Sequence, residues 1–205
     1  MIEDIVLPQD KPITLCMYSG GLDSTAMLYK LLIVDHTPER HYHIHHVIIK
    51  NYQRRDIPEM MSAHDILADM KENAINPFTF STSLIEYPTF NHRTLNDHDA
   101  FTFMAANMAL LVPKINQVAY GLTKDDIGDT YSDRREKNSH IWNSIYGKHM
   151  DRVYPISHLT KRDAWDLLPS FYRRLTWSCR EPVWKGNMAK PCGLCRPCKV
   201  IASFK

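Results

Sequence analysis

The sequence predicts an α/β fold built on a doubly wound, mainly parallel sheet. Short apolar runs rich in β-branched residues alternate with longer amphipathic segments, and this alternation is typical of parallel strands joined by crossover helices. A Gly-Gly turn follows the first apolar run, and Gly121 follows a later one. Ligands bind such sheets at the carboxyl ends of the strands, so we expect a functional site at that edge.

The expected elements follow from periodicity and from start and stop signals. Strands are expected at residues 13–18, 42–50, 78–82, 117–120 and 153–154. Helices are expected at residues 22–34, 57–71, 99–112, in a segment that runs through Trp142, and up to residue 168 with Thr160 as its N-cap. Asn96 or Asp97 is expected to cap the third helix. Residues 1–170 are predicted to form the main domain, with residues 171–205 packed on it as a small metal-binding segment.

Charge and hydropathy exclude several functional classes. The chain has 25 basic and 23 acidic residues and a net charge of +2, so nucleic-acid binding is not expected from its charge. Residues 1–4 are acidic and lack the apolar core of a secretory signal. No stretch approaches the roughly 20 apolar residues of a membrane span. We therefore expect a cytoplasmic protein.

A glycine loop between the first strand and the first helix is the clearest functional feature. It directly follows Tyr18 and reads Ser19-Gly20-Gly21-Leu22-Asp23-Ser24-Thr25. Two glycines allow a sharp turn and let the backbone approach an anion closely. The N–H groups at the helix start point at the same spot, and the hydroxyls of Ser19, Ser24 and Thr25 add donors. The loop is therefore predicted to bind phosphate.

The kind of phosphate site follows from what the loop contains and lacks. A Walker loop requires Gly-Lys-Ser/Thr, and a dinucleotide fingerprint requires a third glycine; neither is present. The pattern Ser-Gly-Gly-x-Asp-Ser-Thr resembles that of the PP-loop ATP pyrophosphatases. The resemblance implies that Tyr18 and the loop bind ATP and grip its β,γ-pyrophosphate while AMP is transferred to an oxygen atom. Asp23 is expected either to hold Mg²⁺ or to brace the turn.

Four of the five cysteines gather near the C-terminal end. Cys192, Cys195 and Cys198 form two overlapping Cys-x-x-Cys units, and Cys179 precedes them. Four thiolates in such spacing favour a closed tetrahedral site, in which zinc has a structural role. An iron–sulfur cluster is the alternative, although the Cys-Pro ending of ferredoxin motifs is absent. Cys16 lies in the first apolar run and is expected in the core.

Combined with the loop, the cysteines make the chain similar to the 7-cyano-7-deazaguanine synthases of queuosine biosynthesis. The matching segments are Thr176-Trp177-Ser178-Cys179, Cys192-Gly193-x-Cys195-x-x-Cys198, Pro155-Ile156 followed by Lys161 and Trp165, and Gly121 followed by Asp126 and Tyr131-x-Asp133-x-Arg135. The resemblance implies an ATP-dependent C–N ligase. It adenylates the carboxylate of a 7-deazaguanine and uses ammonia to form the amide and then, after a second activation, the nitrile.

The resemblance also assigns roles to residues. The implied catalytic residues are Ser19, Asp23, Ser24 and Asp126, the last also a candidate Mg²⁺ contact. The implied substrate contacts are Tyr131, Asp133, Arg135 and Arg93. From the residues alone, Asp126 equally fits a solvated acidic loop, and Tyr131 and Arg135 equally fit loop packing and helix-start charge. A homodimer is also implied.

The departures from that family fall on the substrate side. Residues 94–97 read Thr-Leu-Asn-Asp where the family has Pro-Gly-Arg-Asn, so Arg93 would replace the missing arginine. Only Tyr52-Gln53 remains of a Tyr-Gly-Gln-x-His motif, and the chain stops too soon after Cys198 for a helix to be expected there. These departures leave three alternatives: a variant enzyme that stops at the amide, a PP-loop enzyme that modifies tRNA by thiolation, and a non-catalytic nucleotide-binding module.

Two polar clusters in and after the second strand receive simpler interpretations. His41, His43 and His45 alternate along the strand and share one face, and His46 follows them. The run contains no acidic partner, which favours an exposed strand face over a metal site. Arg54 and Arg55 are expected either to reach phosphate or to end the strand in solvent.

Overall fold

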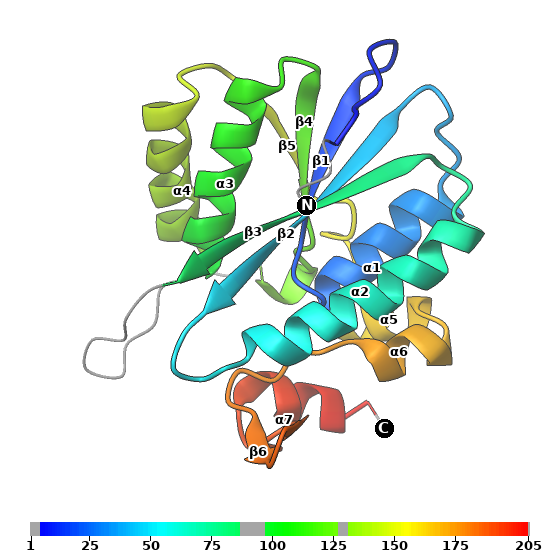
Figure 1. The fold of residues 1–205 in the computed structure, drawn as a ribbon, viewed down its shortest axis with the longest axis vertical. Coiled ribbons are helices and arrows are strands. Elements are labelled where there is room, and N and C mark those ends of the chain that lie inside the picture. The colour runs from blue at the N-terminus through cyan, green and yellow to red at the C-terminus, as the bar shows by residue number, and fades with distance from the viewer. Residues whose placement is uncertain (1–4, 87–96, 127–130, 205) are drawn as a thin grey trace.

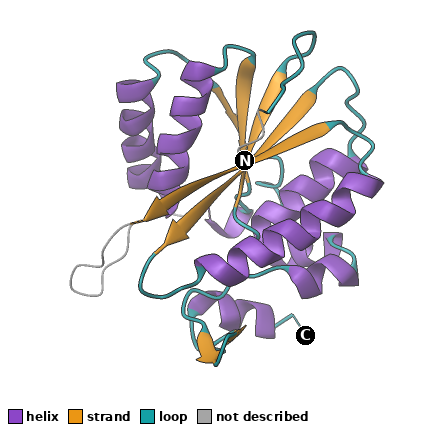
Figure 2. Ribbon diagram, viewed as in Figure 1, coloured by secondary structure: helices purple, strands orange, loops and turns teal. Residues whose placement is uncertain are grey.

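The computed structural model describes residues 5–86, 97–126 and 131–204, and for residues 131–135 it describes the backbone alone. Five parallel strands form one sheet in the order β3-β2-β1-β4-β5 (Figure 2). They are β1 (Ile13–Tyr18), β2 (His41–Lys50), β3 (Phe78–Glu86), β4 (Ile115–Tyr120) and β5 (Asp151–Val153). The predicted parallel α/β fold is confirmed. The strand order reverses between β1 and β4, which places the switch point beside the glycine loop.

Helices cover both faces of the sheet (Figure 1). One face carries α1 (Leu22–Tyr29), α2 (Asp56–Asn73), α5 (Lys161–Leu167) and α6 (Ser170–Leu175), and α1 continues into a π-helical turn, η1 (Lys30–Val34). The other face carries α3 (Asp97–Leu111) and α4 (Tyr131–Ile145). Among the described residues, every helix is too short or too polar to cross a membrane.

The sheet separates two apolar cores. Ile44 of β2 packs with Leu28, Ile66 and Trp165 on the α1 side, while on the α3 side Leu15 and Val118 pack with Ala106 and Trp142. β1 is buried along its whole length, as expected for the central strand of a parallel sheet. Burial on both faces fixes the end of β1, and with it the position of the glycine loop.

Several boundaries differ from those expected. β3 extends to Glu86 because its whole second half pairs with β2, a long-range contact that the short apolar run did not reveal. Asp97, expected as a cap, lies inside α3; Asn96 lies outside the described residues. The capping role of Thr160 is confirmed, since its side chain accepts from Asp163 N and Asp163 accepts from Thr160 N in a capping box.

The C-terminal segment contains more structure than expected. A short antiparallel hairpin, β6 (Val183–Lys185) and β7 (Met188–Lys190), lies between Cys179 and Cys192, and α7 (Arg196–Ala202) begins directly after Cys195. The expectation that no helix follows Cys198 was therefore wrong, because Cys198 itself lies in α7. This segment lies below α2 in the view of Figure 1.

The histidines of β2 were wrongly assigned to an exposed face. His43, His45 and His46 are each 2% exposed. His41, His43 and His45 bond in turn to hydroxyls of β3, with Thr79 between the first two and Ser81 between the last two, at 2.7–3.0 Å. These bonds to a neighbouring strand satisfy both ring nitrogens of His43, whereas His45 Nε2 and His46 Nε2 are buried without a partner among the described residues.

Candidate functional site

The glycine loop turns from β1 into α1 at the carboxyl edge of the sheet. Gly20 has φ +76°, and a Cβ there would lie 2.9 Å from Glu59 O of α2. A Cβ on Gly121, which follows β4, would lie 2.6 Å from Ser24 Cα. Both glycines are therefore required by close backbone approaches. They bring α2 and the end of β4 against the loop that is predicted to bind phosphate.

Side chains of the loop hold its shape from within. Ser24 Oγ donates to Gly21 O at 3.2 Å, and Ser19 Oγ lies 3.0 Å from Ser24 Oγ. Thr25 is fully buried and its hydroxyl lies 3.3 Å from that of Tyr18. The hydroxyls of Thr25 and Tyr18 therefore brace the turn, whereas Ser19 and Ser24 line it. Leu22 is buried and begins α1.

The start of α1 offers free backbone donors. The N–H groups of Asp23 and Ser24 have no acceptor among the residues the structure describes. At a helix N-terminus such groups, together with the positive end of the helix dipole, favour an anion. The arrangement that the sequence predicted for phosphate is therefore present in the backbone.

Lys161 is a site residue that the sequence reasoning did not assign. Its ammonium, from the first residue of α5, lies 2.6 Å from Asp23 Oδ2 and 3.0 Å from Asp126. Burial opposes its charge, yet the two carboxylates raise its pKa. The same ammonium lowers the pKa of Asp126 against the effect of burial. A fixed cation therefore stands beside the loop. In the sequence, only the resemblance of the stretch from Pro155 to Lys161 to the 7-cyano-7-deazaguanine synthases pointed to Lys161.

The acidic pair beside Lys161 fits a divalent cation. Asp23 Oδ1 is buried and has no partner among the described residues, and burial raises the pKa of this carboxyl. Asp126 also accepts from the N–H and hydroxyl of Thr123, which fixes its orientation. An unpaired carboxylate oxygen close to an expected polyphosphate is the kind of ligand that Mg²⁺ takes.

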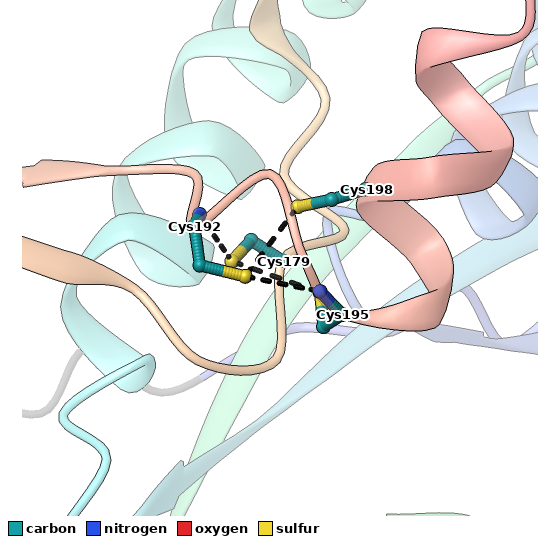
Figure 3. A group of neighbouring side chains, drawn as sticks. All are labelled: Cys179, Cys192, Cys195 and Cys198. Atoms are coloured by element: carbon teal, nitrogen blue, oxygen red, sulfur yellow. Dashed lines mark hydrogen bonds between the residues drawn. The ribbon is translucent and has the colours of Figure 1, made fainter.

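The four C-terminal cysteines converge on one point (Figure 3). Their sulfur atoms all lie within 4.8 Å of one another, with 4.0 Å between Cys179 and Cys195 and between Cys192 and Cys198. Backbone N–H groups of Leu194 and Cys195 donate to Cys192 Sγ and lower its pKa to about 6. Donors placed around a sulfur atom in this way stabilise the thiolate that binds a metal. The structure thus supports a metal site formed by these four cysteines.

The size of this site bears on the metal. Tetrahedral Zn–S bonds of about 2.3 Å place sulfur atoms roughly 3.8 Å apart, close to the 4.0 Å of the two separations. The other sulfur separations extend to 4.8 Å at most. All four ligands come from the protein, so the group can hold a metal.

A charged junction joins the metal segment to the sheet edge. Asp97, at the start of α3, pairs through one carboxylate oxygen with Arg55 and through the other with Arg180, and Arg55 also lies 3.4 Å from Glu59. Arg55 is 3% exposed, so the expectation that it ends the strand in solvent was wrong, while a contact with phosphate stays a prediction. Arg54 stacks on the ring of Trp184, 4.3 Å from its centroid.

The expected substrate contacts are only partly placed. Tyr131, Asp133 and Arg135 lie in the first two turns of α4, which begins beyond the 3-10 turn η2 (Lys124–Asp126), and their side chains are outside the described set. Arg93 lies outside the described residues. Their roles stay predictions.

Comparisons with known proteins support the fold. No family model and no curated protein matches the sequence. The structure is similar to that of the U34-tRNA thiolase NcsA from Methanococcus maripaludis with its [4Fe-4S] cluster, at a TM-score of 0.54 and 13% identity. The match covers 95% of this chain but 65% of that one. The chain therefore shares the fold of this neighbour and spans about two thirds of its length.

Proposed function

We propose that the protein is an ATP-dependent enzyme that splits ATP between its α- and β-phosphates. The observation that carries this proposal is the position of Lys161, whose ammonium lies 2.6 Å from Asp23 Oδ2 at the phosphate-binding loop. A turn that only connected a strand to a helix would have no use for a half-buried cation held by two carboxylates beside free N–H donors.

The chain's own groups suit a reaction in which pyrophosphate leaves. The N–H groups of Asp23 and Ser24 and the ammonium of Lys161 would stabilise negative charge that develops on the departing group. Mg²⁺, when bound at Asp23 and Asp126, would share that charge. Positioning and electrostatic stabilisation would thus supply the catalysis, with no covalent enzyme intermediate.

For the substrate we propose a 7-deazaguanine acid, activated as an acyl adenylate and converted with ammonia to the amide and nitrile. The sequence resemblance supports this choice, and Asp133 would accept hydrogen bonds from the guanine-like N–H edge. The side chains of His98 and Tyr154 stack on either side of Tyr120, with centroids 5.5 and 6.2 Å from its ring. Tyr120 is buried, whereas the outer rings of His98 and Tyr154 are partly exposed and would suit contact with a planar base. The altered residues before α3 make an enzyme that stops at the amide the nearest alternative.

One incubation tests the reaction. Purified protein is mixed with ATP, Mg²⁺, ammonium and 7-carboxy-7-deazaguanine, and AMP and product mass are followed by chromatography and mass spectrometry. We expect AMP that depends on the acid, with nitrile as the final mass. AMP with a mass that stops at the amide supports the shorter reaction. If AMP stays at the level without the acid, this substrate is wrong.

We propose zinc as the metal of the cysteine site and a homodimer as the assembled form. The 4.0 Å sulfur separations support zinc. Metal analysis should find one zinc per chain, and a brown protein that contains iron and sulfide would contradict it. Light scattering after size exclusion tests the dimer, which a monomer mass would rule out.

A tRNA-modifying enzyme is the second candidate, favoured by an uneven charge distribution. Residues 171–205 carry eight basic residues and one acidic, a net charge of +7, whereas residues 1–170 carry a net charge of −5. Lys185 and Lys190 share the outer face of the β6–β7 hairpin, and both are exposed. Among the described residues, no carboxylate lies within 4.0 Å of either ammonium. Such a surface suits a phosphate backbone, and the structural neighbour NcsA is itself a tRNA thiolase.

Transfer RNA binding separates the two candidates. Fluorescence anisotropy with a tRNA transcript should show salt-dependent binding if the second candidate holds, and Lys185→Glu with Lys190→Glu should weaken it at least tenfold. The matched control is Lys71→Glu with Lys148→Glu, since both residues lie in residues 1–170, and it should leave tRNA binding unchanged. Absence of binding at 50 mM salt leaves the small-molecule reaction as the function of the site.

A further inference from the structure

The segment that carries the first cysteine also contacts the glycine loop. Trp177 N donates to Gly20 O at 2.9 Å, and Leu22 N donates to Ser178 Oγ at 3.1 Å. A side chain from beyond α6 therefore reaches the first N–H group of α1, 156 residues earlier in the chain. The hydroxyl that makes this contact comes from outside both the loop and its helix.

The hydroxyl protons of the loop serines are already engaged. Ser24 Oγ donates to a carbonyl, Gly21 O, so the 3.0 Å contact with Ser19 Oγ requires Ser19 to be the donor. Ser178 Oγ accepts from Leu22 N, and its own proton has no acceptor among the residues that the structure describes. Of these three serines, Ser178 therefore has the proton available for a ligand.

The position of Ser178 Oγ suits a contact with phosphate. A Cβ on Gly21 would lie 3.4 Å from this oxygen and 3.4 Å from Ser19 Oγ, so both hydroxyls flank the same glycine. The oxygen also lies at the N-terminus of α1, where the free N–H groups of Asp23 and Ser24 begin. Ser178 is only partly exposed, and an anion seated at this helix end would contact it directly.

Neighbouring contacts hold Ser178 in place. The next residue, Cys179, belongs to the metal site, and its carbonyl accepts from Trp177 Nε1 at 3.1 Å. Arg180 pairs with Asp97 at the start of α3. The backbone on the C-terminal side of Ser178 is therefore fixed by a metal ligand and an ion pair, and on its N-terminal side by the bond to Gly20.

We propose that Ser178 is a phosphate-binding residue of the nucleotide site: it accepts from Leu22 N, donates its proton to an oxygen of the ATP β,γ-phosphates, and is held there by metal binding at Cys179. This inference rests on the proposed ATP site. It adds a second consequence, that the metal and pyrophosphate stabilise each other's binding, because coupling between two sites is reciprocal.

The test compares ligands that do and do not reach Ser178. Titration calorimetry measures ATP, pyrophosphate and AMP binding to the metal-loaded protein without the acid substrate. Ser178→Ala should weaken ATP and pyrophosphate by about tenfold, the effect of one hydrogen bond to a charged group, and leave AMP unchanged. Ser178→Thr, which keeps the hydroxyl, should restore pyrophosphate binding. The control is Ser203→Ala, since Ser203 Oγ only donates to Val200 O in the last turn of α7.

Metal removal supplies a second measurement, whose first comparison uses the wild-type protein alone. Chelation should weaken pyrophosphate binding to the wild-type protein by a similar factor and change that of Ser178→Ala by less than twofold. If Ser178→Ala weakens AMP and pyrophosphate binding equally, or leaves pyrophosphate binding unchanged, the proposed role of Ser178 is wrong. If chelation leaves pyrophosphate binding to the wild-type protein unchanged, the proposed link between Ser178 and metal binding at Cys179 is wrong. If the wild-type protein binds neither ATP nor pyrophosphate, the proposed function itself fails. Binding without turnover of the acid leaves this inference standing.

Discussion

Lys161 Nζ lies 2.6 Å from Asp23 Oδ2, although 138 residues separate the two in the chain. The contact joins α5, which follows the last strand of the sheet, to the first loop, and Asp126 of η2 lies 3.0 Å from the same ammonium. One ammonium between two carboxylates leaves a net charge of −1, and Asp23 Oδ1 still faces no partner among the described residues. The cluster is therefore suited to receive a further cation together with ATP.

Replacing Lys161 by Met should disable the nucleotide site. The variant leaves two unneutralised carboxylates beside the phosphates, so we expect ATP affinity to fall at least tenfold and acid-dependent AMP release to fall about a hundredfold or more. Calorimetry and AMP chromatography measure the two effects. Lys71→Met, on the exposed last turn of α2, is the control. A variant with wild-type AMP release would exclude Lys161 from the site.

Replacing Gly121 by Ala should displace the loop. The added Cβ would lie 2.6 Å from Ser24 Cα and 2.7 Å from Ser24 N. The nearest atoms all belong to the backbone, so no side chain can move aside. We expect a stability loss of about 1–3 kcal/mol and weakened ATP binding. Gly186→Ala separates crowding from strain: φ is +60° there but no atom lies within 4 Å, so it should lower stability by ~1 kcal/mol and leave ATP binding intact. Equal ATP binding by both variants would show that the loop tolerates the displacement.

The parts of the site that the sequence predicted are local. The turn from β1 into α1 was predictable because the apolar strand, the two glycines and the start of the helix are contiguous. The spacing of Cys192, Cys195 and Cys198 likewise indicated a metal site, since three of its ligands lie within seven residues. In both cases a short stretch of chain contains the geometry that its chemistry requires.

The missed features depend on contacts between distant segments. The burial of His43 follows from Thr79 and Ser81 on another strand, so its polarity alone suggested exposure. Ser178 and Lys161 are site residues only because they contact a loop more than 130 residues away in the sequence. The β6–β7 hairpin has strands of three residues each, too short for alternation to reveal.

Removing the metal should destabilise the protein. An ion present at a thousandfold excess over its dissociation constant stabilises the native state by about 4 kcal/mol, so metal removal should lower the melting temperature by roughly 10 °C. Differential scanning calorimetry before and after chelation measures this. Cys195→Ser should behave like the chelated protein, whereas Cys16→Ser, in β1, should keep the full metal content. An unchanged melting temperature after complete metal loss would argue against a structural role.

The histidines of β2 should make stability depend on pH. Hydrogen bonds link His41, Thr79, His43, Ser81 and His45 in a row. Each neutral ring and each hydroxyl has one proton to donate, so all donors in this row face the same direction. Protonating a ring adds a second donor and breaks that order. Burial lowers the pKa of His43 to about 4 and that of His45 to about 4, so both are neutral in the folded protein at pH 7.

In the unfolded protein these histidines bind protons below a pKa of about 6.5, whereas His43 in the folded protein does so only below about 4. The contribution of the neutral histidines to the free energy of unfolding is therefore full above pH 6.5 and is lost as pH falls toward 4. Between pH 7.5 and 5.0 each histidine should account for about 2 kcal/mol of lost stability. Glu59, whose pKa burial raises to about 7, acts in the opposite direction, so the informative quantity is a difference between variants. His43→Leu should reduce the pH-dependent loss by about 2 kcal/mol in urea unfolding, while exposed His64→Leu should leave it unchanged. An identical pH dependence in wild type and His43→Leu would mean that His43 does not take up a proton on unfolding, which would contradict its burial in the neutral form.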